Sequence, residues 1–276
     1  MCVISVAIQK GGSGKTTTAV NLAAALLRRQ KKVLLIDSDP QANLTHSLGV
    51  ADDLPLNLYT EYQKEVSGRE GDLRSTIVVT ESGLPVIPSS RDLAGMEQDL
   101  FSRMAREYKL RKRLLYKLVD EYDYIIIDCP PSFGMLTINA LTASNYVVMP
   151  LQAEFLPRKG VESFLQLLDS AREQLSLDIR LAGFLLTKYS PRKSVNIETR
   201  EWLMTNFGQF LFNSFIHTDI RVSVAQRKGL DIFSYAPRSV AAADYAQFAD
   251  ELILKISPPP DSAQALQTHA ELYDNF

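Results

Sequence analysis

The chain carries the stretch Gln9-Lys10-Gly11-Gly12-Ser13-Gly14-Lys15-Thr16-Thr17 directly after a short apolar, β-branched run, Val3 to Ile8. An Ala- and Leu-rich segment with helical spacing, Thr16 to Arg29, follows it. A strand, a glycine loop and a helix in this order are typical of a phosphate site, because glycines let successive N–H groups point at an anion and the helix adds its positive end. We therefore expect the phosphates of a nucleotide to be bound by Gly11, Gly12, Ser13, Gly14, Lys15, Thr16 and Thr17. In such a loop the lysine reaches the outer phosphates and the first threonine ligates Mg²⁺, which here are Lys15 and Thr16.

The loop departs from the general pattern G-x-x-x-x-G-K-[ST], because a second lysine, Lys10, stands at its start. The alternative interpretation is a glycine turn that enters a helix without binding a ligand. The phosphate loop is favoured because the stretch contains two lysines, three glycines and two threonines, with an expected strand before it and an expected helix after it. The pattern K-G-G-x-G-K-T-[ST] is the deviant Walker A form, and it resembles the ParA/MinD family of dimerising ATPases.

A second apolar run, Val33 to Asp37, predicts a parallel strand buried on both faces, with its carboxyl end beside the loop. Carboxylates there, Asp37 and Asp39, suit a metal's water shell and an attacking water, whereas the alternative is a capped turn into a helix. The segment Asp37 to Thr45 matches the D-x-D-P-Q-x-N motif of the family. By that resemblance Asp39 is the acid needed for hydrolysis and Asp37 is a partner of the metal.

A third apolar run, Tyr122 to Asp128, also ends in an acid, which is the Walker B arrangement for holding Mg²⁺ through water. Many buried strands end in aspartate because of turn chemistry, so this run alone is weak support. The stretch D-C-P-P-S-x-G, from Asp128 to Gly134, resembles that of the same family. We therefore expect Asp128 to belong to the metal site, with Cys129 as a small packed residue.

The composition describes an ordinary globular protein: 276 residues, 46% hydrophobic and 22% charged, with a formal net charge of −2. Any nucleic-acid binding must therefore come from a local basic surface. Cys2 and Cys129 lie far apart without metal-ligand spacing, which favours reduced thiols in a cytosolic protein. No charged leader precedes the first strand, and no apolar run has the length of a membrane span.

Further apolar runs and helical periodicities alternate along the chain, and they predict an α/β fold: one doubly wound, mostly parallel sheet with helices on both faces. We expect residues 1–256 to form a single P-loop ATPase domain and residues 257–276 a mobile tail. Residues 52–83 are polar with weak periodicity and predict a surface excursion. The expected strands are Leu84 to Pro88, Tyr146 to Leu151, Leu181 to Thr187 and Phe210 to Ile216, and the expected helices are Val161 to Leu175, Val195 to Asn206 and Val240 to Ile256.

Arg103 to Lys117 holds seven basic residues and one acid, with apolar residues at helical spacing. This pattern predicts one amphipathic helix with a basic outer face, either solvated or in contact with DNA. Two later segments, from Lys188 to Arg192 and from Asp219 to Ala225, resemble parts of the family near its DNA-binding surface, and they make Arg192 and Arg221 the candidate DNA contacts. By the same resemblance Pro237 borders the adenine, although it could simply stop a strand before the last helix.

The resemblance implies an ATP-bound sandwich dimer in which Lys10 reaches the nucleotide of the partner subunit, so that dimerisation and hydrolysis depend on each other. It further implies non-specific DNA binding, a ParB-like adaptor that stimulates hydrolysis, and a cytoplasmic, nucleoid-associated ATPase that segregates DNA or positions a cargo. A MinD-like membrane ATPase is the alternative. The stretch from Ser262 to Phe276 contains no Lys or Arg and follows three prolines, which disfavours an amphipathic membrane helix and predicts no stable membrane association.

Relatives with metabolic or redox roles form a third class. An iron–sulfur version needs paired cysteines, and no C-x-x-C occurs here. A substrate-modifying ligase without the signature lysine is disfavoured by Lys10. The sequence therefore favours a ParA-like ATPase that uses ATP and Mg²⁺.

Overall fold

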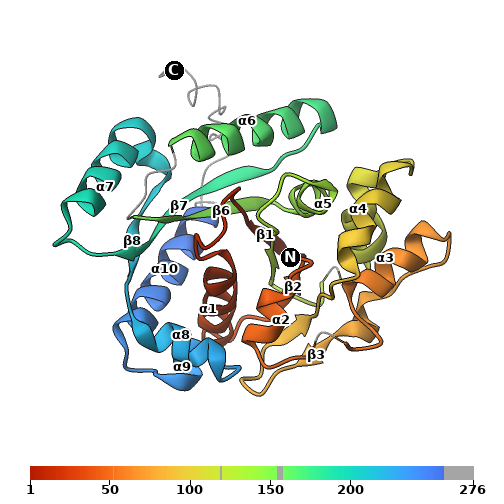
Figure 1. Cartoon of the computed structure of the whole chain (residues 1–276), viewed down its shortest axis with the longest axis horizontal. Helices are drawn as coiled ribbons and strands as arrows, with labels where there is room; N and C mark the ends of the chain where they lie inside the picture. Colours follow the sequence, from red (N-terminus) through yellow and green to blue (C-terminus); the bar gives the residue numbers. More distant parts are fainter. Residues whose placement is uncertain (52, 119, 154–157, 258–276) are drawn as a thin grey trace.

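The computed structural model describes residues 1–51, 53–118, 120–153 and 158–257, and these form an eight-stranded sheet in the order β3-β4-β2-β5-β1-β6-β7-β8 (Figure 1). β3 pairs antiparallel with β4, and every other neighbouring pair is parallel. The mostly parallel α/β fold expected from the sequence is therefore confirmed. The strands are β1 (Cys2–Val6), β2 (Val33–Asp37), β3 (Val78–Val79), β4 (Pro85–Ile87), β5 (Tyr124–Asp128), β6 (Tyr146–Gln152), β7 (Arg180–Tyr189) and β8 (Leu211–His217).

Helices cover both faces of the sheet, which explains why its central strands are continuously apolar. One face packs against α1, α2, α9 and α10, and the other packs against α3 to α7 (Figure 1). In β1, Val3 faces the second group and Ile4 the first. The helices are α1 (Lys15–Arg28), α2 (Asn43–Ser47), α3 (Leu58–Val66), α4 (Leu93–Phe101), α5 (Met135–Ala143), α6 (Arg158–Leu175), α7 (Ser194–Phe207), α8 (Ile220–Arg227), α9 (Ile232–Tyr235) and α10 (Val240–Ile256).

The register of the central strands brings the two acid-ending runs together. β5 lies between β1 and β2, with Val6 opposite Asp128 and Asp128 opposite Asp37. All three strands therefore end at one edge, where the loop that follows β1 also begins. This edge is where open α/β sheets bind their ligands.

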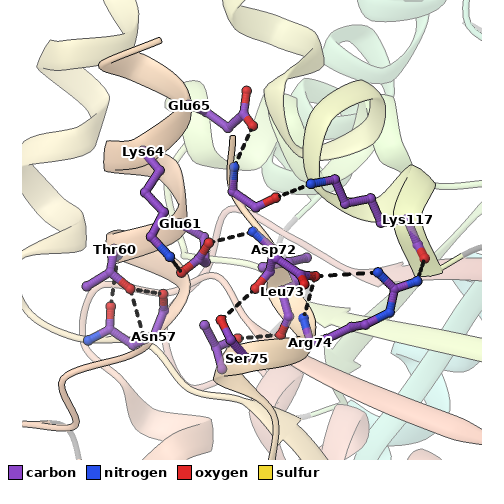
Figure 2. Close-up of polar contacts among 12 residues, drawn as sticks. Asn57, Thr60, Glu61, Lys64, Glu65, Asp72, Leu73, Arg74, Ser75 and Lys117 are labelled. Atoms are coloured by element: carbon purple, nitrogen blue, oxygen red, sulfur yellow. Dashed lines mark hydrogen bonds and ion pairs between the residues drawn. The ribbon is translucent and has the colours of Figure 1, made fainter. Parts of the chain in front are cut away.

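The sequence left open how ordered the polar stretch 52–83 is, and its described residues 53–83 contain α3, a short 3₁₀ turn and β3. Asn57 and Thr60 form a reciprocal cap at the start of α3. Glu61 is fully buried, and its carboxylate accepts the Asp72 N–H at 2.7 Å and binds Lys64 Nζ at 2.6 Å. Figure 2 shows that the network also includes Lys117, which comes from the later turn Leu115–Leu118. Leu58 and Tyr62 of α3 are fully buried in the core, and the buried polar contacts of Glu61 hold the segment together with them.

The single amphipathic helix expected from Arg103 to Lys117 is wrong. α4 ends at Phe101, and three short turns follow: Arg106–Tyr108, Lys109–Leu114 and Leu115–Leu118. Met104, expected on the buried side, is 91% exposed. Asn139 of α5 accepts the Leu110 N–H and donates to the Arg106 carbonyl, and the segment forms 3₁₀ and π turns instead of an α-helix.

Candidate functional site

A cavity of about 580 Å³ opens at the carboxyl edge of the sheet. This volume falls within the range of small-molecule sites. Segments far apart in the sequence form its walls, from the glycine loop after β1 to α8 and α10. Its lining comprises Gly11, Gly12, Gly14, Lys15, Thr16, Thr17, Asp39, Asn43, Ser47, Pro131, Thr187, Lys188, Ile216, His217, Thr218, Asp219, Ile220, Val222, Ser223, Gln226 and Tyr245.

The glycine loop has the backbone shape of an anion cradle. Gly12 and Gly14 have φ angles of +72° and +93°, which favour glycine, and a Cβ at Gly11 or Gly12 would meet nothing within 4 Å. Gly14 is the N-cap of α1, whose first turn contains no acidic residue. The positive end of α1 is therefore left for an anion. Thr187 Oγ1 donates to the Ser13 carbonyl at 3.0 Å and anchors the loop to β7.

Lys15 is buried in the cavity wall, and its Nζ donates to the Lys10 carbonyl at 2.9 Å. Burial lowers the pKa of Lys15, while the nearby charge of Asp128 opposes that shift. Burial also lowers the pKa of Lys10. The structure therefore brings the two lysines of the motif together at the loop, with Lys15 held on an uncharged carbonyl that a phosphate could replace.

Thr16 and Asp128 form the donor set that a hard cation requires. Thr16 Oγ1 donates to Asp128 Oδ2 at 2.6 Å. Asp128 Oδ1 is buried without a hydrogen-bond partner among the described residues. Among the residues that the structure describes, no group of three His, Cys, Asp or Glu side chains lies close enough together to bind a metal by itself. These residues fit Mg²⁺, which takes few protein oxygens and completes its shell with water and phosphate.

Asp37 and Asp39 have different surroundings. Asp37 is fully buried, and its oxygens accept the Asp39 N–H at 3.1 Å, the Thr45 N–H at 2.9 Å and the Thr45 hydroxyl at 2.7 Å. Burial raises the pKa of Asp37 to about 6. Asp39 lines the cavity and accepts the Gln41 N–H at 2.9 Å. These contacts make Asp37 the residue that orients the turn, and they leave Asp39 facing the ligand space.

Several cavity residues escaped the sequence reasoning. Gln226 of α8 donates to Thr17 Oγ1 at 2.9 Å, across 209 positions of sequence. Asn43 and Ser47 come from α2, directly after the Asp39 turn. Asn43 belongs to the D-x-D-P-Q-x-N motif, which could have identified it. The sequence carries no signal for Gln226, because its role depends on how α8 packs against the loop.

The remaining candidates lie outside the cavity. Pro237 is exposed between α9 and α10 and is absent from the cavity lining, so its contact with adenine gains no support and stays a prediction. Arg192 is exposed in the turn between β7 and α7. Arg221 lies on α8, and its Nε donates to Asp219 Oδ1 at 2.8 Å. Arg221 therefore adjoins the cavity through its helix, and Arg192 follows a strand whose end lines it.

We expect Asp128→Asn to stabilise the ligand-free protein relative to the wild type, by an amount that grows with pH. Burial, followed by the charge of Asp37, raises the pKa of Asp128 well above 3.8. Between the unfolded and the folded pKa, the unfolded chain releases the proton first, so the wild type loses stability as the pH rises. Asparagine cannot ionise and avoids this loss. Thermal unfolding midpoints from about pH 5 to about pH 8 would measure the difference.

Asp99→Asn on the exposed side of α4 is the matched control, and its difference from the wild type should not grow in this way. A pH-independent difference for Asp128→Asn would contradict the raised pKa.

Comparison with known proteins identifies relatives of this chain. A family model described as an AAA domain matches residues 1–181. Soj of Bacillus subtilis, a sporulation initiation inhibitor protein, is 39% identical over 252 residues, which cover 91% of this chain and 97% of Soj. The chromosome partitioning protein ParA of Myxococcus xanthus is 35% identical over 257 residues, which cover 93% and 89% of the two chains.

A solved structure extends the likeness to three dimensions. Cobyrinic acid a,c-diamide synthase from Mycobacterium smegmatis, with a bound ATP analog and magnesium, superposes with a TM-score of 0.74 at 34% identity. The match covers 91% of this chain and 93% of that one. The fold, the loop and these relatives agree, and the chain belongs to the ParA/Soj family of P-loop ATPases.

Proposed function

We propose that this protein is a Mg²⁺-dependent ATPase that dimerises on ATP, binds DNA without sequence preference and uses hydrolysis to segregate DNA or to position a cargo. The observation that carries the proposal is that one cavity is shared by the phosphate loop and by α8, the helix of Arg221. A nucleotide in this cavity would contact both the hydrolytic residues and the helix proposed to face DNA. The relatives named for chromosome partitioning support the same assignment.

ATP fits the cavity with its phosphates on the loop. Lys15 would exchange the Lys10 carbonyl for phosphate oxygens, and the N–H groups of the loop would bind the same anion. Thr16 and Asp128 would hold Mg²⁺, with Asp37 fixing the neighbouring turn. The ion supplies charge neutralisation for the transferred phosphoryl group. Asp39 lines the same space and would orient the attacking water.

Lys10 provides the link between hydrolysis and dimerisation. It stands at the start of the loop, and its carbonyl holds Lys15 in this structure. In a dimer that brings two loops together, the Lys10 ammonium would reach the phosphates of the partner subunit. A charge supplied across an interface stabilises the transition state in the dimer and not in the monomer.

α8 is the proposed DNA-facing element. Its Arg221 side chain is 46% exposed, and the Asp219 carboxylate beside it is 5% exposed. Exposed arginines bind phosphates without reading sequence, and such binding weakens as salt rises. Arg192 is the second candidate contact. Because the whole chain has a net charge of −2, the proposal requires these local cations.

We expect Arg221→Ala to weaken the binding of the ATP-bound protein to a non-specific duplex by roughly tenfold, and to reduce the salt slope by about one unit. The substitution removes one phosphate contact and leaves the Asp219 cap on the backbone N–H of residue 221. Fluorescence anisotropy over a salt series, with ATP, ADP or no nucleotide, measures both quantities. Arg69→Ala, exposed beyond the end of α3, is the matched control.

Hydrolysis of ATP without DNA binding in any nucleotide state would refute the DNA-based function. Undiminished binding by Arg221→Ala, with a wild type that binds in an ATP-dependent way, would refute α8 as the contact.

Within this proposal the protein is cytoplasmic and nucleoid-associated, and a ParB-like adaptor stimulates its hydrolysis. The proposed ATPase domain spans residues 1–256. The proposed mobile tail lies almost wholly outside the described residues, which end at 257. Among the described helices, none is long and apolar enough to cross a membrane. Binding to anionic vesicles in place of DNA would instead favour the MinD-like alternative.

A further inference from the structure

The order of the strands gives the cavity one end near β1 and a far end near β8. The phosphate loop follows β1, and β6, β7 and β8 lie beyond β1 in the sheet. Neighbouring strands are about 5 Å apart, so the end of β8 is roughly 15 Å along the sheet from β1. At the end of β8 the cavity is lined by Ile216 to Ile220 and Val222. With the phosphates on the loop, the base of a nucleotide would extend toward this end.

His217, the last residue of β8, lines this far end with its ring held in place. Its Nδ1 lies 3.0 Å from Asp244 Oδ2 on α10, and its ring packs on Phe215 with centroids 4.9 Å apart. A carboxylate only accepts hydrogen bonds, so Nδ1 carries the hydrogen in the neutral ring. The other ring nitrogen, Nε2, is then a hydrogen-bond acceptor.

A purely structural role explains part of this arrangement. Acidic residues of α10 cover exposed N–H groups of β8: Glu251 accepts from Asn213 and Ser214, and Asp244 accepts the His217 N–H at 2.8 Å. This edge capping accounts for the backbone bond of residue 217. It does not require an imidazole at the cavity wall, nor the second bond from Asp244 to the ring.

We propose that His217 is the residue that selects adenine at the base end of the cavity, an inference that rests on the proposed ATP site. Nε2 would accept a hydrogen bond from the exocyclic 6-amino group of adenine. A purine with a 6-oxo group would place an oxygen lone pair opposite the lone pair of Nε2, so this hydrogen bond would be lost. Asp244 acts through His217 by holding the acceptor tautomer.

ATP and inosine triphosphate test this directly, because their purines differ in whether position 6 carries an amino group or an oxo group. We expect the wild type to bind ATP at least roughly tenfold more tightly than inosine triphosphate. His217→Ala should bring this ratio close to one, and Asp244→Ala should lower it by a smaller factor. The dissociation constants are measured by displacement of a fluorescent nucleotide with Mg²⁺ present, and circular dichroism confirms folding.

His46→Ala on α2, outside the cavity lining, is the matched control and should keep the wild-type ratio. Two results would overturn the inference alone: a wild type that binds ATP but shows no preference, or a His217→Ala variant that keeps the full ratio. A wild type that binds neither nucleotide would refute the proposed ATP site, and this inference with it.

Discussion

Lys15→Ala is expected to weaken ATP binding by roughly 100-fold or more and to abolish measurable hydrolysis. Lys15 is the buried cation of the phosphate loop, and its ammonium lies within hydrogen-bond distance of the Lys10 carbonyl. Alanine leaves the N–H groups of the loop in place but removes the charge that would neutralise the outer phosphates. The loss should therefore be largest for ATP and smaller for ADP, which has one phosphate fewer.

The measurements are nucleotide affinity by titration calorimetry and phosphate release at saturating ATP. Lys32→Ala is the matched control, because Lys32 is exposed immediately before β2, at the opposite end of the strands from the cavity. It should bind and hydrolyse ATP as the wild type does. Full activity in Lys15→Ala would remove this loop from the proposed function.

Asp39→Ala has the second largest expected effect: hydrolysis slower by roughly 100-fold to 10,000-fold, with ATP affinity retained. Asp39 lines the cavity, and burial raises its pKa. Its neighbour Asp37 is occupied with the turn, which leaves Asp39 as the carboxylate able to orient a water. Because hydrolysis ends the dimeric state in the proposed cycle, the variant should accumulate as an ATP-bound dimer.

Light scattering coupled to gel filtration, with ATP or ADP, would detect that dimer, and single-turnover phosphate release would measure the rate. Asp99→Ala, exposed on α4, is the control for the loss of an acidic side chain. Normal hydrolysis by Asp39→Ala would exclude Asp39 from the mechanism. Slow hydrolysis without a dimer would keep its catalytic role and refute the proposed link to dimerisation.

The glycine loop and the strands that end in Asp37 and Asp128 were predictable from the sequence because their signals are local. Gly12 and Gly14 before Lys15 have positive φ angles, and the runs that end at Asp37 and Asp128 are apolar because both faces of their strands are buried. Such features are encoded in short segments. Most elements after residue 140 were predictable for the same reason, and α10 has the expected bounds, Val240–Ile256, but the short helices α8 and α9 were not predicted.

The local pattern was least informative where buried polar contacts add to the apolar ones. The turns between Arg106 and Leu118 depend on the side chain of Asn139, which no pattern in those turns encodes. α3 is tied down by the buried carboxylate of Glu61, a residue type that usually predicts an exposed surface. In both places the hydrogen-bond partners, 11 positions apart for Glu61 and Asp72 and 29 for Leu110 and Asn139, lie outside a short hydrophobic pattern.

The sequence by itself therefore determined the class of fold, the phosphate loop and the acids beside it. The tertiary structure decided how these parts meet: Asp37 opposite Asp128 in neighbouring strands, Gln226 against Thr17, and His217 against Asp244 at the far wall of the cavity. The physical reason is that strand order and helix packing set these contacts. They join residues 27 to 209 positions apart, beyond the reach of any local periodicity.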